Sequence, residues 1–326
     1  MTRRKALLAA AAIGLAAQFS TSVPAQAAGE PPCSTAKLIV PWGAGGDTYV
    51  IFQIFEEAVN RLSPKHKIQL VTVPGQGGNK GAKEAAKAKA DGCTLFAIHQ
   101  SALISYLNGR IDFTWDKFEP VAHLTSTPEV FAASGKAPWK TFKEMLAEAK
   151  AKPDTVKVGA TFGSTSQFGW LILEDMAGVK FKYIPFDGTA QRATALLSNT
   201  VQLGTTNVTT SGKHFESGEL KPLVLADVKR SKRFPNMPTM KELGIDMTYA
   251  LNRGIMAPKG TPKATVAYWA SVFEKAIKDP ALVKQFSTKE TDLIFLGPAA
   301  YGAWWKKEYD RHEKIAIKIG MFKKKK

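Results

Sequence analysis

Short apolar runs alternate with stretches of helical periodicity along the first third of the chain. The runs at 37–41, 68–73 and 94–98 are rich in β-branched and apolar residues and predict strands. Apolar residues recur at helical spacing over 50–62, and an Ala/Lys-rich stretch at 82–90 predicts a second helix. Strands separated by helix-length segments are typical of βαβ units, so this part of the chain is expected to build a parallel sheet.

The same alternation returns later in the chain with different residues. The expected strands are 130–134, 156–160, 181–185, 222–226 and 254–257, and the expected helices are 141–151, 168–177, 190–198, 264–278 and 299–319. This return of the pattern predicts a second α/β unit.

Several expected strands end in loops rich in Gly, Ser or Thr that open helices. These loops are 42–49, 74–81, 161–167 and 186–189. Helix N-termini expose unpaired backbone N–H groups, and ligands of open α/β sheets sit at the carboxyl ends of the strands. Glycine at such junctions is also common for turn geometry alone, so one loop by itself is weak support. Together the loops predict a cleft that binds a carboxylate or a phosphate.

The first 27 residues have the pattern of a secretory signal peptide. A basic start at 3–5 is followed by a short apolar run at 7–17 and by a small-residue cleavage site at 25–27. The apolar run is too short to span a bilayer. We therefore expect export to the periplasm, and a mature protein that is not tethered, because the residues before Cys33 do not resemble a lipid-anchor signal.

The chain has two cysteines, Cys33 and Cys93, and their spacing is unlike that of metal ligands. In an oxidising compartment such a pair predicts a disulfide rather than two free thiols. Each cysteine lies just before an expected strand, and neighbouring parallel strands start at the same edge of a sheet. A bridge would close a loop of about 60 residues and contribute about 4 kcal/mol in the chain-entropy model.

The chain is basic, with a formal net charge of +17. The signal peptide supplies three of these charges and the lysines at 323–326 supply four, which leaves +10 for the folded body. A basic body favours anionic partners. The basic residues are scattered and no nucleic-acid-binding motif is found, so nucleic acid is not expected as a partner.

The sequence offers little that is typical of an enzyme. No Gly-x-Ser-x-Gly motif occurs, and the glycine pattern at 75–80 matches neither a dinucleotide fingerprint nor a P-loop. The five histidines lack metal-ligand spacing, so neither a metal nor another cofactor is expected. His99 ends a strand and could face the cleft, although a single histidine there is more often a packing or hydrogen-bonding residue.

Short motifs in a specific order make the chain resemble a known family. They include LIVPWGAGG at 38–46, PGQGGNKGA at 74–82, DGCTL at 91–95, GSTS at 163–166, IPFDG at 184–188, KRS at 229–231, FPNMPT at 234–239 and APKGTP at 257–262. The chain resembles the receptors of tripartite tricarboxylate transporters, the TctC-like or Bug-type periplasmic solute-binding proteins. The resemblance covers nearly all of the chain after the signal peptide.

The resemblance implies a two-domain α/β clamp like a type II periplasmic binding protein, each domain a mostly parallel sheet flanked by helices. One domain would comprise 28–128 plus 253–326, and the other 129–252. A small carboxylate would lie between them, held by backbone N–H groups and small hydroxyls, and would pass to membrane transporter subunits; the receptor itself would be a monomer. The implied ligand-binding residues are Trp42, Gly43, Ala44, Gly45, Gly46, Asp47, Thr48, Tyr49, Gly77, Gly78, Gln100, Ser101, Phe162, Ser164, Thr165, Ser166, Gln167, Phe186, Asp187, Gly188, Thr189 and Asn207.

The chain departs from the family pattern in its first loop. Family members usually continue Gly-Gly-Thr-Asp, whereas this chain places Tyr49 where that carboxylate stands, and Gln167 where a histidine is common. Aromatic rings that could wall the cleft are Trp42, Tyr49, Phe162, Phe168 and Phe186, although some would be core residues. They suggest an aromatic or otherwise apolar carboxylate as the ligand.

Two alternative functions are compatible with the same two-lobed fold. The protein could be a receptor for another importer, or a sensor that presents its ligand to a signalling protein. An enzyme is the alternative of a different class, and it lacks the expected active-site residues. For any of the receptors we expect hinge closure around the ligand, with hinges near 125–130 and 250–255.

Overall fold

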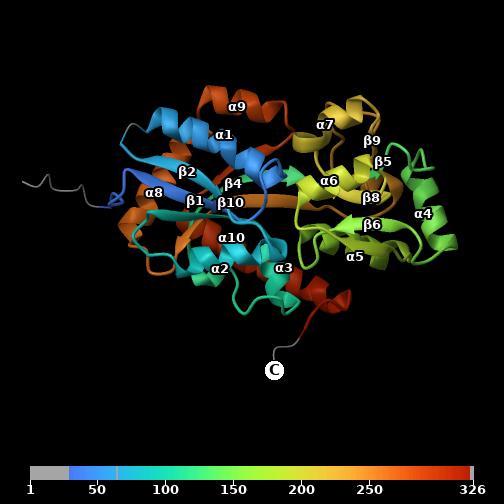
Figure 1. Cartoon of the computed structure of the whole chain (residues 1–326), viewed down its shortest axis with the longest axis horizontal. Coiled ribbons are helices and arrows are strands. Elements are labelled where there is room, and N and C mark those ends of the chain that lie inside the picture. Colours follow the sequence, from blue (N-terminus) through green and yellow to red (C-terminus); the bar gives the residue numbers. More distant parts are fainter. Residues whose placement is uncertain (1–28, 64, 324–326) are drawn as a thin grey trace, which may run out of the picture.

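The computed structural model describes residues 29–63 and 65–323 of the chain. The expected signal peptide and the last three lysines lie outside the described residues. The described residues form two sheets, each flanked by helices, which lie side by side (Figure 1). We call the two halves the first and the second lobe after their sheets.

The first sheet has the order β11-β4-β10-β3-β1-β2 within the described chain. Its strands are β1 (Thr35–Val40), β2 (Lys67–Thr72), β3 (Thr94–Ile98), β4 (Phe118–Pro128), β10 (Ala250–Pro258) and β11 (Asp292–Leu296). One face is covered by α1 (Asp47–Leu62), α8 (Lys263–Ile277) and α9 (Pro280–Ser287), and the other by α2 (Asn79–Lys87), α3 (Ser101–Leu107) and α10 (Pro298–Lys318) (Figure 1). Apolar side chains of each helix set pack against the sheet and form two core clusters.

The second sheet has the order β7-β6-β8-β5-β9 in the described residues. Its strands are β5 (Val130–Ser134), β6 (Lys157–Ala160), β7 (Lys182–Pro185), β8 (Leu203–Thr206) and β9 (Leu220–Leu225). Its faces are covered by α4 (Phe142–Ala151) and α5 (Thr165–Ala177) on one side, and by α6 (Thr189–Leu197) and α7 (Val208–Glu216) on the other. The last turns of α10 also pack against this lobe, because Ala316 joins its core cluster.

Both sheets are mixed, whereas the sequence predicted mostly parallel ones. The pairs within β1–β3 and within β6–β8 are parallel, as expected of βαβ units. β4, β5, β9, β10 and β11 pair antiparallel with their neighbours. The reason lies in the connection between the lobes: β4 carries the chain toward the second lobe and β10 brings it back, so adjacent strands run in opposite directions.

The two crossings between the lobes lie against one another. Only Glu129 separates β4 from β5, and its backbone N–H donates to Tyr249 O (3.1 Å) next to the start of β10. The Ala226 N–H in turn donates to Glu129 O (2.9 Å). Glu129 is therefore fixed at the centre of the double crossing.

The predicted disulfide is confirmed. Cys33 and Cys93 are bonded, with their Cα atoms 5.8 Å apart and a sequence separation of 60. The Lys37 N–H donates to Cys93 O (2.9 Å), which shows that the bridge lies beside the paired starts of β1 and β3. The bridge thus ties the first strand to its neighbour at the edge opposite to the loops that face the second lobe.

Candidate functional site

A small cavity lies between the two lobes, at the carboxyl ends of β1, β3 and β6. Its volume is about 30 Å³, which is room for about two water molecules. It is lined by Trp42, Gly46, Asp47, Thr48, His99, Ser101, Glu129, Thr161, Ser164, Thr165, Ser166, Gly188, Thr189, Arg192 and Leu251. Because both lobes contribute to so small a space, this arrangement is the closed form of the clamp.

Besides the short α3, which begins at Ser101, three helices begin at this cavity: α1 from the first lobe, and α5 and α6 from the second. Their N-cap residues Gly46, Ser164 and Gly188 make no side-chain capping bond. The same holds for α2, α3, α8 and α10, whereas α4, α7 and α9 are capped by Thr141, Asn207 and Asp279. Uncapped N-termini leave backbone N–H groups and the positive end of the helix dipole for an anion. The arrangement therefore favours a negatively charged ligand between the lobes.

Asp47 links the lobes through its carboxylate. The side chain is 4 % exposed and accepts hydrogen bonds from the hydroxyls of Thr189 (3.1 Å) on α6 and Thr210 (2.5 Å) on α7. Both donors belong to the second lobe, while Asp47 begins α1 of the first. The carboxylate therefore stabilises the closed form by bonds that an open clamp would lose.

Arg253 lies behind Asp47, fully buried in β10. Its guanidinium donates to the hydroxyls of Thr48 (3.1 Å) and Thr127 (2.9 Å). Its Nη2 atom is 3.9 Å from Asp47 Oδ2 and has no hydrogen-bond partner in the described part of the chain. Burial lowers the pKa of this guanidinium, while Asp47 and Glu129 act to raise it.

Arg192 reaches the cavity from α6 and is 4 % exposed. Its guanidinium donates to Thr205 O (2.9 Å) and to the hydroxyls of Thr189 (3.1 Å), Thr161 (3.3 Å) and Ser166 (3.5 Å). All of these acceptors are uncharged. Burial lowers the pKa of Arg192, and the nearby charges of Glu129 and Asp47 oppose that shift.

Glu129 lines the cavity from the crossing between the lobes. Burial raises the pKa of its carboxyl to about 8, against the lowering effect of Arg192 and Arg253. At neutral pH this carboxyl is therefore mainly protonated and can donate a hydrogen bond.

Trp42 and His99 form a stacked pair at one wall, with ring centroids 4.0 Å apart. Burial lowers the pKa of His99 well below its usual value, so its ring is neutral, and Nδ1 accepts from the Ser101 N–H (3.3 Å). The indole of Trp42 also lies against Gly78, where a Cβ atom would come within 3.0 Å of the ring. Glycine at 78 thus allows the ring to take this position.

Ten of the residues predicted as ligand-binding line the cavity. They are Trp42, Gly46, Asp47, Thr48, Ser101, Ser164, Thr165, Ser166, Gly188 and Thr189. Gly43 and Asp187 line an adjoining pocket of about 120 Å³ that shares Trp42 and Gly188 with the cavity. The loops chosen from the sequence are thus brought together from both lobes.

The remaining predicted glycines and Ala44 lie beside the cavity rather than in its wall. Ala44 and Gly45 are exposed. The Gly77 N–H donates to Asp187 Oδ1 (3.3 Å), which joins the second loop of the first lobe to the second lobe.

Three predicted polar residues use their side chains for the fold. Gln100 bonds to the backbone of both Ala250 and Asn252 (3.0 Å each), and Gln167 accepts from the Gly163 N–H (2.8 Å). Asn207 caps α7 through Oδ1, and its buried Nδ2 has no partner among the described residues.

Of the five rings that could wall the cleft, only Trp42 lines the cavity within the described residues. Tyr49 packs against the core of the first lobe, and Phe168 and Phe186 pack in the two cores of the second. Phe162 meets Tyr183 edge to face, with centroids 6.5 Å apart. The rings therefore do not gather around one space.

Sequence reasoning identified Asp47 but missed the other charged residues of the site. Glu129 and Arg192 line the cavity, as do Thr161, Leu251 and His99, the last of which was interpreted as a packing residue. A charge inside an otherwise apolar strand, as at Arg253 between Leu251 and Ile255, is a signal that could have been used, because such charges are buried only with a partner.

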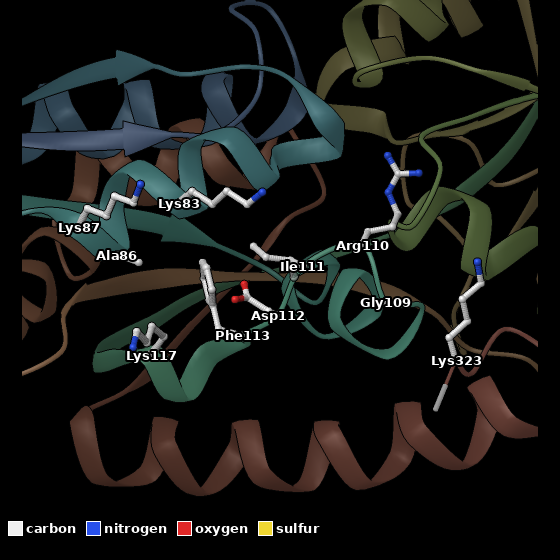
Figure 2. Close-up of a pocket in the computed structure, with 10 residues that line it drawn as sticks. All are labelled: Lys83, Ala86, Lys87, Gly109, Arg110, Ile111, Asp112, Phe113, Lys117 and Lys323. Atoms are coloured by element: carbon white, nitrogen blue, oxygen red, sulfur yellow. The ribbon is translucent and has the colours of Figure 1, made fainter. Parts of the chain in front are cut away.

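A larger pocket lies on the outside of the first lobe. It has a volume of about 770 Å³ and holds the basic side chains of Lys83, Lys87, Arg110, Lys117 and Lys323. All five are exposed. Figure 2 shows Lys83 and Lys87 extending from α2 on one side of this pocket, with Lys117 on the other.

Neither a membrane-spanning helix nor a metal-binding cluster is present in the described residues. No helix there is long and apolar enough to cross a membrane. No group of three or more His, Cys, Asp or Glu side chains in residues 29–63 and 65–323 is placed to hold a metal ion.

The sequence of the chain is similar to those of known proteins. The chain is 28% identical over 322 residues to the "UPF0065 protein in gbd 5'region" of Cupriavidus necator, covering 97% of this chain and 95% of that protein. It is 26% identical to "Protein BugT" of Bordetella pertussis, over 82% of this chain and 83% of the relative.

Solved structures with the same fold include the periplasmic binding protein BugD, with a TM-score of 0.84 and 25% identity, covering 89% of this chain and 99% of that one. Another is MatC of Rhodopseudomonas palustris with bound malate, with a TM-score of 0.80 and 25% identity over 87% and 99% of the two chains. The expected two-domain α/β clamp is confirmed by the two sheets and these neighbours.

The family described as "Tripartite tricarboxylate transporter family receptor" matches residues 59–321, which is most of the chain. This match confirms the resemblance drawn from the short motifs. The chain belongs to the family of tripartite tricarboxylate transporter receptors, a family of solute-binding proteins.

Proposed function

We propose that this protein is a periplasmic receptor that captures a small carboxylate between its lobes and delivers it to the membrane subunits of a tripartite tricarboxylate-type transporter. The observation that carries the proposal is the convergence of three uncapped helix N-termini, from both lobes, on one buried cavity. Such N-termini bind anions, and a ligand held by both lobes stabilises their closed arrangement.

The residues proposed to hold the carboxylate are those of the cavity wall with N–H or hydroxyl donors. Thr165 and Ser166 at the start of α5, Thr189 at the start of α6 and Thr48 on α1 supply them. Ser101 adds a contact between the lobes, since its hydroxyl accepts from the Thr165 N–H (3.3 Å). MatC, a structural relative, was solved with malate, which supports a small organic acid as the ligand class.

A cavity of about 30 Å³ does not hold a malate-sized molecule, so ligand entry requires the lobes to separate. The proposed hinges are the crossings near 125–130 and 250–255, where Glu129 alone separates β4 from β5 and the chain returns into β10 beside it. The proposed domains are 28–128 plus 253–326, and 129–252.

The cavity wall offers little apolar surface, which limits the apolar part of the ligand. Trp42, stacked on His99, offers one flat surface, which suits a small acid with one apolar face. An aromatic carboxylate remains a proposal that rests on this one ring, because the other candidate rings pack elsewhere.

Thermal unfolding of the mature protein against a panel of small carboxylates tests the proposal. The panel spans aliphatic mono-, di- and tricarboxylates, amino acids and aromatic carboxylates. A true ligand at about 100 times its dissociation constant stabilises the fold by about 2.7 kcal/mol, a shift of a few degrees. If no carboxylate raises the unfolding temperature, the proposed ligand class is wrong.

A further inference from the structure

The site between the lobes contains more buried positive charge than its own carboxylates can match. Arg192 and Arg253 are 4 % and 0 % exposed. Burying a guanidinium is unfavourable unless a negative charge and hydrogen bonds compensate for the lost water. The distance from each guanidinium to the nearest carboxylate oxygen therefore shows which arginine lacks a counter-ion.

Arg253 has a distant counter-charge, since Asp47 Oδ2 lies 3.9 Å from its Nη2. Arg192 has no carboxylate oxygen within 4.0 Å among the described residues, and its four hydrogen bonds go to a carbonyl and three hydroxyls. Arg192 is thus a buried cation without a direct counter-ion, and it is the one of the two that lines the cavity.

The two carboxyls nearby do not supply the missing charge. Asp47 is already bonded to Thr189 and Thr210, and it is the carboxylate beside Arg253. Glu129 is mainly protonated at neutral pH because burial raises its pKa to about 8. Asp47 lies beside Arg253, and no carboxylate oxygen of the described residues lies within 4.0 Å of Arg192, so the positive charge of Arg192 is the unmatched one.

We propose that Arg192 is the counter-ion of the ligand carboxylate, and that the buried cluster selects ligands that bring a single negative charge into the cavity. This inference rests on the proposed function and narrows it from carboxylates in general to monoanions. A dianion would leave one negative charge unmatched in a buried site, which costs binding free energy. The Nη1 atom faces Thr161 and Ser166 at bonds of 3.3 and 3.5 Å, long contacts that an incoming carboxylate oxygen can replace.

Titration calorimetry with matched acids tests this assignment. The probes are lactate, malate and citrate at pH 7, which carry one, two and about three charges on related hydroxy-acid frames, together with benzoate and phthalate. Lactamide is the uncharged control for lactate. We expect a monoanion to bind at least tenfold more tightly than its dianionic or trianionic counterpart, and lactamide to bind far more weakly than lactate.

The same titrations on Arg192→Gln test the role of the residue. Loss of a charged hydrogen-bonding partner is expected to weaken monoanion binding by roughly 10- to 100-fold. Arg192→Lys keeps the charge and should retain part of the affinity, which covers the case that the glutamine variant does not fold. The matched control is Lys83→Gln, which removes one positive charge from the exposed outer pocket and should leave the affinity unchanged.

The outcomes separate the two proposals. If no carboxylate binds the native protein, the proposed function and this inference both fall. If carboxylates bind and either Arg192→Gln has the affinity of Lys83→Gln or a dianion binds as tightly as its monoanion, the inference alone is wrong.

Discussion

The cavity between the lobes and the outer cationic pocket differ in an instructive way. The outer pocket has a volume of about 770 Å³ and five exposed basic side chains, whereas the inner cavity has about 30 Å³ and two buried guanidiniums at or behind its wall. Solvated lysines need no partner, because water already stabilises their charge. Buried guanidiniums do, so the smaller space carries the stronger requirement for an anion.

An anion is also attracted more strongly in the inner cavity than in the outer pocket. Two unit charges 4 Å apart attract by about 1 kcal/mol in bulk water and by about 4 kcal/mol at the effective dielectric of a partly buried site. An anion beside Lys83 or Lys87 therefore gains little, and salt screens it further. An anion beside Arg192 gains more and also replaces weak hydroxyl contacts.

The largest effect is expected from removing Arg253, the deeper of the two inner guanidiniums. Arg253→Met leaves Asp47 buried without its cation, and removing one partner of a buried pair typically costs about 3 kcal/mol or more of unfolding free energy. The exposed control Lys117→Met should change the unfolding free energy by no more than about 0.5 kcal/mol. Urea unfolding of both variants measures the difference.

The double variant Arg253→Met/Asp47→Asn sharpens that result. It removes the unmatched carboxylate and should recover part of the lost stability. Equal stability of Arg253→Met and Lys117→Met would show that burial gives the inner charges no special role.

A change of pH is expected to have a smaller effect on stability and on carboxylate affinity, through Glu129. Glu129 faces Arg192 on α6, Asp47 on α1 and Arg253 on β10, and burial raises its pKa to about 8. The folded protein holds this proton up to about pH 8, whereas an unfolded glutamate loses it near its ordinary value, so the contribution of Glu129 to stability falls as pH rises between those values. Above pH 8 its negative charge also competes with the ligand for Arg192.

Carboxylate affinity should therefore decrease as pH rises through about 8. Glu129→Gln imitates the protonated form and should bind with little change between pH 7 and 9, while the native protein loses up to about tenfold. Calorimetry at both pH values measures this, and a native protein whose affinity stays constant over the range would argue against a protonated Glu129.

The strand and helix pattern could be predicted for most of the chain because its periodicity is strong. The expected strands 94–98 and 130–134 coincide with β3 and β5, and the expected helices agree with α4, α8 and α10 to within one residue at each end. β4 was missed. Its sequence contains Pro120, which is untypical of a strand interior. The proline is accommodated because it lies at an irregularity of the β4–β10 pairing.

The helix N-termini of the site and Asp47 were predicted from the sequence, whereas Glu129 and Arg192 were not. Loops rich in Gly, Ser and Thr mark helix N-termini directly, so Gly46, Ser164 and Gly188 could be found locally. Arg192 lies on a helix and Glu129 between two strands, where a charged side chain is equally compatible with solvent. Only the packing of the two lobes against one another shows that both are buried.

Most of the aromatic residues that were predicted to wall the cleft pack in the cores instead. Phe168 and Phe186 stand next to the predicted loops in sequence, but one turn of helix or one strand step directs each into a core. Because these rings were assigned to the cleft from their position next to the loops in sequence, the predicted cleft was more apolar than the observed one. The observed cavity wall consists mostly of polar residues, which favours a small polar ligand.

The central claim is that a carboxylate binds between the lobes, at the helix N-termini and beside Arg192. A crystal structure of the protein with its best-binding acid from the carboxylate panel tests this most directly. We expect both lobes to contact the ligand around a cavity wider than the present one, with one carboxylate within hydrogen-bonding distance of the first turns of α5 and α6 and a carboxylate oxygen on the Arg192 guanidinium. A ligand bound in the outer pocket of Lys83 and Lys87, or between the lobes with its carboxylate turned away from Arg192, would contradict it.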